Sequence, residues 1–200
     1  MKKVLLVSLI LLSSVCASAQ TDVETLTFMP KVGINLADFT NEPNTDPRFG
    51  WVAGAEFGYQ VAKRLNVSLG FLYSEQGTID HEKYRGMDVK EEIKNNYINM
   101  PLVASVYVVK GLALKLGVQL GVNVKSDYEV SALGIGVTGH LNDLGVKINT
   151  LDLSFPIGLS YELKNFMIDA RYNYGATKIC DDNDYRNSVF QFTVGYKFVL

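Results

Sequence analysis

Apolar residues alternate strictly with small or polar residues from residue 112 to residue 124. Every even-numbered residue in this segment is Leu or Val, and every odd-numbered residue is Ala, Lys, Gly, Gln or Asn. Successive side chains of a β-strand point to opposite faces of the strand. The two-residue period therefore predicts a strand with one apolar face and one polar or tightly packed face.

Seven further segments carry the same alternation, which gives eight predicted strands. The eight predicted strands, with the first segment included, occupy residues 28–36, 49–59, 65–73, 97–106, 112–124, 151–162, 166–174 and 190–200. Each is close to the ~9–11 residues that a tilted membrane-spanning strand requires. Three residues put an apolar side chain on the polar face, namely Val52, Leu72 and Met167. The pattern predicts an all-β fold, an eight-stranded antiparallel up-and-down transmembrane β-barrel.

The predicted connections alternate in length along the chain. Tight links fall at residues 62–64, 109–111 and 163–165, and longer ones occupy residues 37–48, 77–95, 125–149 and 175–187. Outer-membrane barrels alternate in this way, with short periplasmic turns and longer external loops. We therefore expect both ends of the barrel chain on the periplasmic side.

The first residues have the order of a secretory signal. Lys2 and Lys3 precede an apolar run over residues 4–12, and Ala17-Ser18-Ala19 follows. This order predicts a signal peptide over residues 1–19, cleaved after Ala19, and a barrel domain over residues 20–200. Removing residues 1–19 takes two lysines from 19 basic and 21 acidic residues, which leaves a net charge of −4. An acidic domain argues against a nucleic-acid partner.

The rest of the chain holds no apolar run of the ~18 residues that a membrane helix needs. An exported membrane protein without such a helix has to be a closed barrel, because lipid offers no partner to backbone polar groups. The alternative is a soluble lipocalin-like barrel with its aliphatic residues inside. The polar face favours the membrane barrel, since it is rich in Gly, Ser, Asn and Gln and poor in Lys and Glu.

If the apolar face meets lipid, the polar face lines the lumen, and eight charged side chains point inward. These are Lys31, Glu56, Lys115, Asp152, Glu162, Asp169, Arg171 and Lys197. An eight-stranded barrel is only wide enough for side chains to fill it, and buried charges have to pair. We expect a structural, salt-bridged lumen without an open water channel.

No segment predicts a cofactor or a metal site. Residues 134–139 read G-x-G-x-x-G, but a dinucleotide site needs this motif between a strand and a helix, and here it falls in a predicted loop. The acidic stretch at residues 181–184 lacks the glycine and the distal glutamate of a calcium loop.

No catalytic residue is predicted either. The chain has two histidines, His81 and His140, in different predicted loops. A lipid-modifying hydrolase at the barrel rim would need His140 beside Ser131 or Asp143, and their spacing does not single them out. We therefore predict a protein that is not an enzyme.

The predicted loop over residues 77–95 is dense in charges of both signs. It is the candidate contact surface for partners, which include outer-membrane lipid and other envelope proteins. The candidate partner residues are His81, Glu82, Lys83, Arg85 and Asp88.

Three short motifs resemble those of the PorT-like outer-membrane β-barrel proteins. Tyr97-Ile98-Asn99-Met100-Pro101-Leu102 resembles their Y-[IL]-x-[IML]-P-L segment, Lys31-Val32-Gly33-Ile34-Asn35-Leu36 the G-x-N segment of their first strand, and Gly195-Tyr196-Lys197-Phe198 their closing strand. The resemblance covers residues 20–200 and departs at Leu200, where such barrels usually end on an aromatic residue. It implies a small, porin-like Gram-negative barrel, and it transfers no active site.

The leading hypothesis is a non-enzymatic outer-membrane barrel with a structural or binding role carried by its external loops. The alternative is an accessory component of an outer-membrane protein secretion machinery, to which the resemblance links a few family members. A rim-active lipid-modifying hydrolase and a soluble lipocalin-like binder are the remaining hypotheses.

Overall fold

The structure is a computed structural model that describes residues 22–40, 45–84, 87–132, 135–140, 149–180 and 184–200. The predicted signal peptide lies outside the described residues and stays a prediction. Ten β-strands are assigned: β1 (Leu26–Thr40), β2 (Thr45–Ala62), β3 (Leu65–Tyr84), β4 (Met87–Val109), β5 (Leu112–Ala132), β6 (Ile135–His140), β7 (Leu151–Leu163), β8 (Phe166–Gly175), β9 (Arg186–Tyr196) and β10 (Phe198–Val199). No helix among the described residues has the length and apolar character needed to cross a membrane.

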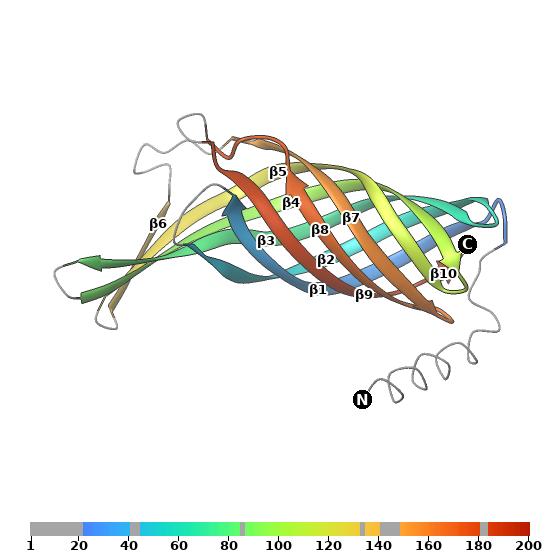
Figure 1. Cartoon of the computed structure of the whole chain (residues 1–200), viewed down its shortest axis with the longest axis horizontal. Helices are drawn as coiled ribbons and strands as arrows, with labels where there is room; N and C mark the ends of the chain where they lie inside the picture. Colours follow the sequence, from blue (N-terminus) through green and yellow to red (C-terminus); the bar gives the residue numbers. More distant parts are fainter. Residues whose placement is uncertain (1–21, 41–44, 85–86, 133–134, 141–148, 181–183) are drawn as a thin grey trace.

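Eight of these strands close into a ring in chain order, β1-β2-β3-β4-β5-β7-β8-β9, with β9 pairing back onto β1 (Figure 1). All neighbouring strands are antiparallel. β10 continues the line of β9 along β1, and β6 adds to β5 outside the ring. The predicted eight-stranded antiparallel up-and-down barrel is confirmed.

The alternation sorts the side chains as the sequence predicts. On β5, Leu116 is 61% exposed whereas Gln119 is 2% exposed, and the same contrast repeats around the ring. The apolar face is the outer surface, and the polar face is the packed interior. A lipocalin-like barrel would bury the apolar face, so this geometry excludes that hypothesis.

Two-residue turns at positions 63–64, 110–111 and 164–165 join the strands at one end of the barrel, which we call the turn end. The tight links predicted there are confirmed. Gly111 has a φ of 81°, which is strained for residues with a side chain and explains a glycine in this turn. Asn165 stabilises the third turn, because its Nδ2 donates to the Lys197 carbonyl oxygen at 2.9 Å.

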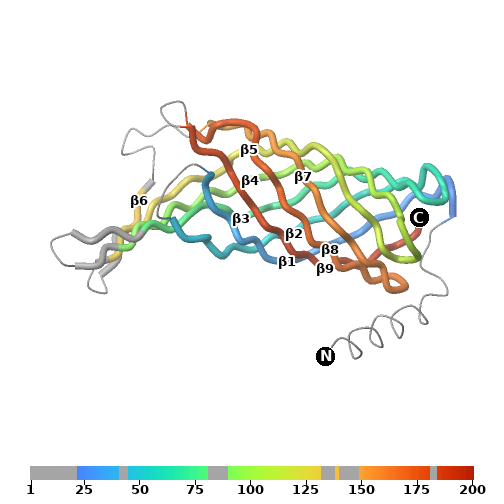
Figure 2. The backbone as a smooth tube through the Cα atoms, viewed as in Figure 1, coloured from blue at the N-terminus to red at the C-terminus, as the bar shows by residue number. Residues whose placement is uncertain are grey.

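The opposite end differs from the prediction. The segments predicted as loops over residues 77–95 and 125–149 are largely strand, because β3, β4 and β5 continue far beyond the ring and β6 pairs with β5. We call this projecting sheet of β3, β4, β5 and β6 the extended end; Figure 2 shows it reaching beyond β7, β8 and β9. Residues 80–92 carry charged side chains at both odd and even positions, which removes the alternation that marks a strand. Residues 127–132 do alternate, and the prediction missed this short signal.

Two irregularities mark the base of the extended end. Six residues of β2 from Pro47 to Val52 face five residues of β3 from Thr78 to Ser74. On β5, Val124 is an extra residue against the neighbouring Asn96 and Tyr97 of β4. Such β-bulges bend and twist a strand, so they redirect the sheet where it leaves the barrel.

Candidate functional site

Five charged side chains form a central cluster in the lumen. They come from four strands: Lys31, Glu56, Lys115, Asp169 and Arg171. Arg171 donates two hydrogen bonds to Asp169, from Nε to Oδ1 at 2.8 Å and from Nη2 to Oδ2 at 2.7 Å. The same Nη2 also donates to Glu56 Oε1 at 2.9 Å. Lys31 Nζ lies 2.9 Å from Glu56 Oε1 and 3.7 Å from Asp169 Oδ2, and Lys115 also pairs with Asp169.

The cluster holds three cations and two anions, and each of these side chains is at most 4% exposed. Moving a charge out of water costs several kcal/mol, which a pair recovers only with close contacts and further hydrogen bonds. Asp169 forms ion pairs with all three cations, so its carboxylate neutralises more of the cluster's positive charge than any other contact.

A second ion pair lies nearer the turn end, between Lys197 and Glu162. Tyr107 donates a hydrogen bond from its hydroxyl to Glu162 Oε2 at 2.9 Å. The sequence prediction ended the fourth strand at residue 106 and so missed Tyr107. The signal was present, since Tyr107 continues the odd-numbered polar face of that strand.

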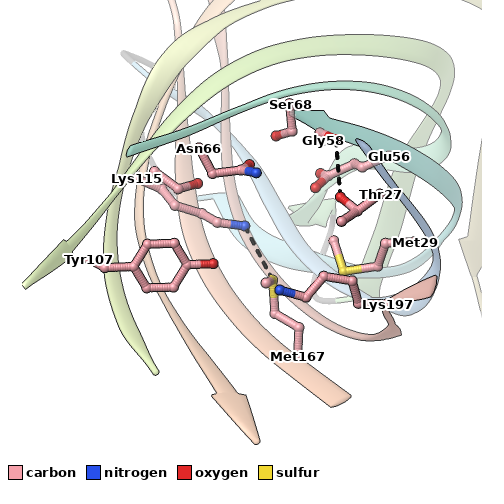
Figure 3. Close-up of a pocket in the computed structure, with 11 residues that line it drawn as sticks. Thr27, Met29, Glu56, Gly58, Asn66, Ser68, Tyr107, Lys115, Met167 and Lys197 are labelled. Atoms are coloured by element: carbon pink, nitrogen blue, oxygen red, sulfur yellow. Dashed lines mark hydrogen bonds between the residues drawn. The ribbon is translucent and has the colours of Figure 1, made fainter. Parts of the chain in front are cut away.

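Between the two groups lies a cavity of about 20 Å³, which has room for about one water molecule. Figure 3 shows the ammonium groups of Lys115 and Lys197 pointing toward Met167, and Lys115 Nζ lies 3.7 Å from Met167 Sδ. Glu56, Ser68 and nine further residues line the cavity. Side chains therefore occupy the lumen here and leave space for single waters.

Asp152 behaves differently from the other seven predicted lumenal charges. It is 5% exposed, and no cation among the described residues lies within ion-pair distance of it. Its Oδ1 accepts hydrogen bonds from Asn187 Nδ2 at 3.1 Å and from Thr177 Oγ1 at 3.3 Å. The expectation that every lumenal charge pairs is wrong for this residue, because neutral donors satisfy it instead.

The three residues that break the alternation are also inside. Val52, Leu72 and Met167 are 0%, 1% and 7% exposed, and Val103 is likewise buried at 1%. The interior of the barrel is thus a mixed core, with the central cluster set among apolar side chains. Such packing explains why the polar face tolerates these apolar residues.

Gly33 and Asn35 of the G-x-N segment contribute to the packing of neighbouring barrel strands. A Cβ at Gly33 would lie 1.9 Å from the carbonyl oxygen of Phe192, so the close approach of β1 and β9 requires glycine. Asn35 Nδ2 donates to Ser74 Oγ at 3.0 Å and to the Glu75 carbonyl oxygen at 2.9 Å, beside the β2–β3 bulge. Both residues hold the wall together, which fits a motif that carries no chemistry.

A cross-strand ion network runs over the base of the extended end. Glu92 lies 2.7 Å from Arg48 Nε, 3.3 Å from Lys90 Nζ and 3.8 Å from Lys94 Nζ. Lys94 continues the network to Glu129 on β5 at 2.5 Å. Burial acts to raise the pKa of Glu92, but the hydrogen bond from Arg48 and the charge of Lys94 outweigh it and hold the pKa below 4.5.

The candidate partner residues lie at the far tip of this sheet. The backbone places His81, Glu82 and Lys83 on β3 and Asp88 on β4, so they belong to a strand pair instead of a loop. Their side chains and Arg85 lie outside the part of the molecule that the structure describes. A role for these residues in partner binding stays a prediction.

The backbone gives no support to a hydrolase site. His140 pairs with Asp127, and Ser131 lies four residues farther along β5, a separation of about 13 Å along a strand. Asp143 lies outside the described residues. The G-x-G-x-x-G motif contributes residues 135–139 to β6, whereas a dinucleotide site needs these glycines in the turn between a strand and a helix. In the described ranges, no three His, Cys, Asp or Glu residues gather as metal ligands.

Comparisons with known proteins agree with this architecture. The family model of the outer membrane protein beta-barrel domain matches residues 7–198. No curated protein matches the chain. Among solved structures, Ail, the attachment invasion locus protein of Yersinia pestis, crystallised with the heparin analogue sucrose octasulfate, is 16% identical and has a TM-score of 0.51; the match covers 88% of this chain and all of Ail.

Two further barrels resemble the chain more distantly. Neisserial surface protein A is 15% identical with a TM-score of 0.45, over 90% of this chain and all of that protein. OprG from Pseudomonas aeruginosa is 14% identical with a TM-score of 0.45, over 88% of this chain and 99% of OprG. The family match covers nearly the whole chain, and the chain belongs to the outer-membrane β-barrel domain family.

Proposed function

We propose that this protein is a non-enzymatic outer-membrane barrel that binds a partner through its extended end. One observation carries the proposal: β3, β4 and β5 are 20, 23 and 21 residues long, whereas β8 and β9 have 10 and 11. A membrane strand needs only ~9–11 residues, so about half of each long strand is available outside the bilayer. The packed lumen supports a binding role over a channel.

The identity of the partner is open. Ail was crystallised with a sulfated ligand, but a polyanion requires a basic surface and the mature chain is predicted to carry a net charge of −4. The mixed charges of the extended end, such as Glu92 beside Lys90 and Lys94, suit a polar protein surface.

The PorT-like resemblance supports a second candidate, an accessory role in protein secretion. Three side chains of its most specific motif, Tyr97, Asn99 and Pro101, are buried in the lumen. Tyr97 accepts a hydrogen bond from Asn187 Nδ2 at 3.2 Å inside the barrel. The motif therefore serves packing, and a secretion role would depend on surfaces outside it.

Photo-crosslinking in cells tests the two candidates together. A photo-crosslinking residue is placed at one position at a time. Two positions, Glu91 and Thr138, are exposed on the extended end, and the third, Lys63, is exposed at the turn end. A binding role predicts discrete adducts from the two extended-end positions and none from Lys63. Adducts with envelope secretion proteins from Lys63 alone would favour the secretion role and overturn the first proposal.

A shortened variant is the matched control. Ile79 and Glu92 are directly paired, so residues 80–91 can be replaced by an Asn-Gly turn without altering the ring. The variant should still show the gel shift of a folded barrel on boiling and should lose the adducts formed from Thr138. Adducts that persist would show that the tip is not needed.

A further inference from the structure

The three turns at the turn end all carry basic side chains. Lys63 and Arg64 form the β2–β3 turn, Lys110 lies in the β4–β5 turn and Lys164 in the β7–β8 turn. All four residues are exposed. In the described part of the chain, none of them forms an ion pair.

The acidic residues of this end do not lie on the same turns. Asp22 and Glu24 precede β1, and the Glu24 amide donates to the Gln60 carbonyl oxygen at 2.8 Å, which holds this segment against β2. Glu162 points into the lumen and is paired with Lys197. The three turns lie at the same end of the barrel (Figure 2). Exposed basic side chains that form no ion pair among the described residues therefore follow this rim from β2 to β8, and we call them the basic arc.

Exposed aromatic side chains lie just inside the basic arc. Tyr59 is 45% exposed four residues before Lys63, and Phe166 is 55% exposed two residues after Lys164. The Phe166 and Tyr196 rings pack edge to face with centroids 5.1 Å apart. Aromatic residues in such belts lie at the level of the lipid headgroups. The basic arc therefore lies at the level of the phosphates, which long Lys and Arg side chains reach easily.

The cations at the opposite end of the barrel form ion pairs within the protein. Arg48 and Lys94 contact Glu92, Lys125 lies 2.5 Å from Asp127, and Lys178 lies 3.6 Å from Asp184. Their charges are balanced within the protein. The four turn cations form no ion pair among the described residues, so an external anion can balance their charge.

We propose that Lys63, Arg64, Lys110 and Lys164 bind the headgroups of anionic phospholipids around the turn end. Phosphate oxygens accept charge-assisted hydrogen bonds from ammonium groups and bidentate ones from guanidinium groups. In the predicted orientation this end faces the periplasm, and the ligand belongs to the periplasmic leaflet. The inference depends on the barrel lying in a membrane and is independent of what the extended end binds.

Lipid selectivity in defined bilayers tests the proposal. The barrel is reconstituted with spin-labelled phosphatidylglycerol or phosphatidylcholine, and the protein-bound fraction of each lipid is measured by electron spin resonance. We expect a preference of about two- to fivefold for phosphatidylglycerol, because one basic residue near an anionic surface contributes about 1 kcal/mol. High salt should abolish the preference.

A turn variant with Lys63→Gln, Arg64→Gln, Lys110→Gln and Lys164→Gln should lose the preference. The matched control removes the same number of charges from the opposite end of the barrel, by Lys90→Gln, Lys94→Gln, Lys125→Gln and Lys178→Gln, and should retain it. An equal preference in wild type and turn variant, or an equal loss in the control, overturns the proposal. If the fourfold variant does not fold, Lys110→Gln with Lys164→Gln alone should halve the preference.

Discussion

In the ring, β3, β4 and β5 present aliphatic side chains to the outside and bury polar ones. Beyond the bulges at the base of the extended end, β3 and β4 carry charges on both faces, and β5 carries Lys125, Asp127 and Glu129 on one face. In the central cluster the ion-paired side chains are at most 4% exposed, whereas those of the extended end range from 10% to 42% around Glu92. Breaking an ion pair should therefore cost more stability in the central cluster than on the extended end.

The difference follows from water. Inside the barrel a charge without its partner cannot be solvated, so each contact is needed even where the cluster as a whole adds little stability. On the extended end water replaces a lost partner, and an ion pair is worth ~0–1 kcal/mol. Removing single charges from each region is the direct way to measure this contrast.

Asp169→Asn should have the largest effect. It removes the anion that contacts Lys31, Lys115 and Arg171 and leaves three buried cations with Glu56 alone. We expect a loss of about 3–5 kcal/mol in the free energy of unfolding. Urea titration in lipid vesicles, followed by the gel shift of unboiled samples, measures it.

Glu129→Gln is the control for Asp169→Asn. It removes the partner of Lys94 on the extended end, where both side chains are about one-third exposed. The expected loss is at most about 1 kcal/mol. Equal losses in the two variants would mean that water reaches the central cluster freely.

Gly33→Ala should come next, because its Cβ would meet the Phe192 carbonyl oxygen where β1 closes onto β9. Overpacking of this kind costs about 1–3 kcal/mol. The neighbouring Val32→Ala changes a lipid-facing side chain and should cost clearly less in the same titration. If both variants unfold at the same urea concentration, the β1–β9 pair can move apart to accept a methyl group at position 33 without loss of stability.

Asn35→Ala should destabilise the barrel by about 1–2 kcal/mol, because Ser74 and the Glu75 carbonyl oxygen lose their donor beside the bulge. Asn149→Ala removes an exposed hydrogen bond to the Lys178 carbonyl oxygen and is the matched comparison. Its unfolding free energy should match that of the wild type. Hydrogen exchange at Gln76 should accelerate in Asn35→Ala only.

Acidification should have the smallest effect and should act on the extended end alone. The pKa of Glu92 lies below 4.5 in the folded protein. Its contribution is therefore fully present above pH 4.5 and is lost as the pH falls through the folded pKa. Amides of residues 90–94 should exchange faster at about pH 3 than at neutral pH, after correction for intrinsic rates.

Glu92→Gln checks the source of this pH dependence. The variant should exchange at residues 90–94 with little response to acid, while amides of β9 in the ring respond to pH as in the wild type. An unchanged acid response in Glu92→Gln would place the titrating group elsewhere.

The ring was predictable because each of its strands separates lipid from a packed interior, and this demand fixes a two-residue period over all eight segments. The extended parts of β3 and β4 were not predictable, because charges fall on both of their faces and no two-residue period remains there, whereas β5 keeps only a short alternation over residues 127–132. The alternation along each strand predicted which side chains point into the lumen, including those of Lys31 and Asp169. It could not predict that Asp152 accepts hydrogen bonds from Asn187 on β9 and from Thr177 in the segment after β8, because both residues are distant from Asp152 in the sequence.

The sequence by itself thus determined the eight strands of the ring, their antiparallel order, the direction of the side chains within the ring and the positions of the tight turns. These are local properties of alternation and turn length. The tertiary structure decided which lumenal charges share a contact, why Gly33 and Asn35 hold the wall, and how far β3, β4 and β5 extend. These depend on register between strands distant in the chain, because closing the ring fixes which residues face one another across the lumen.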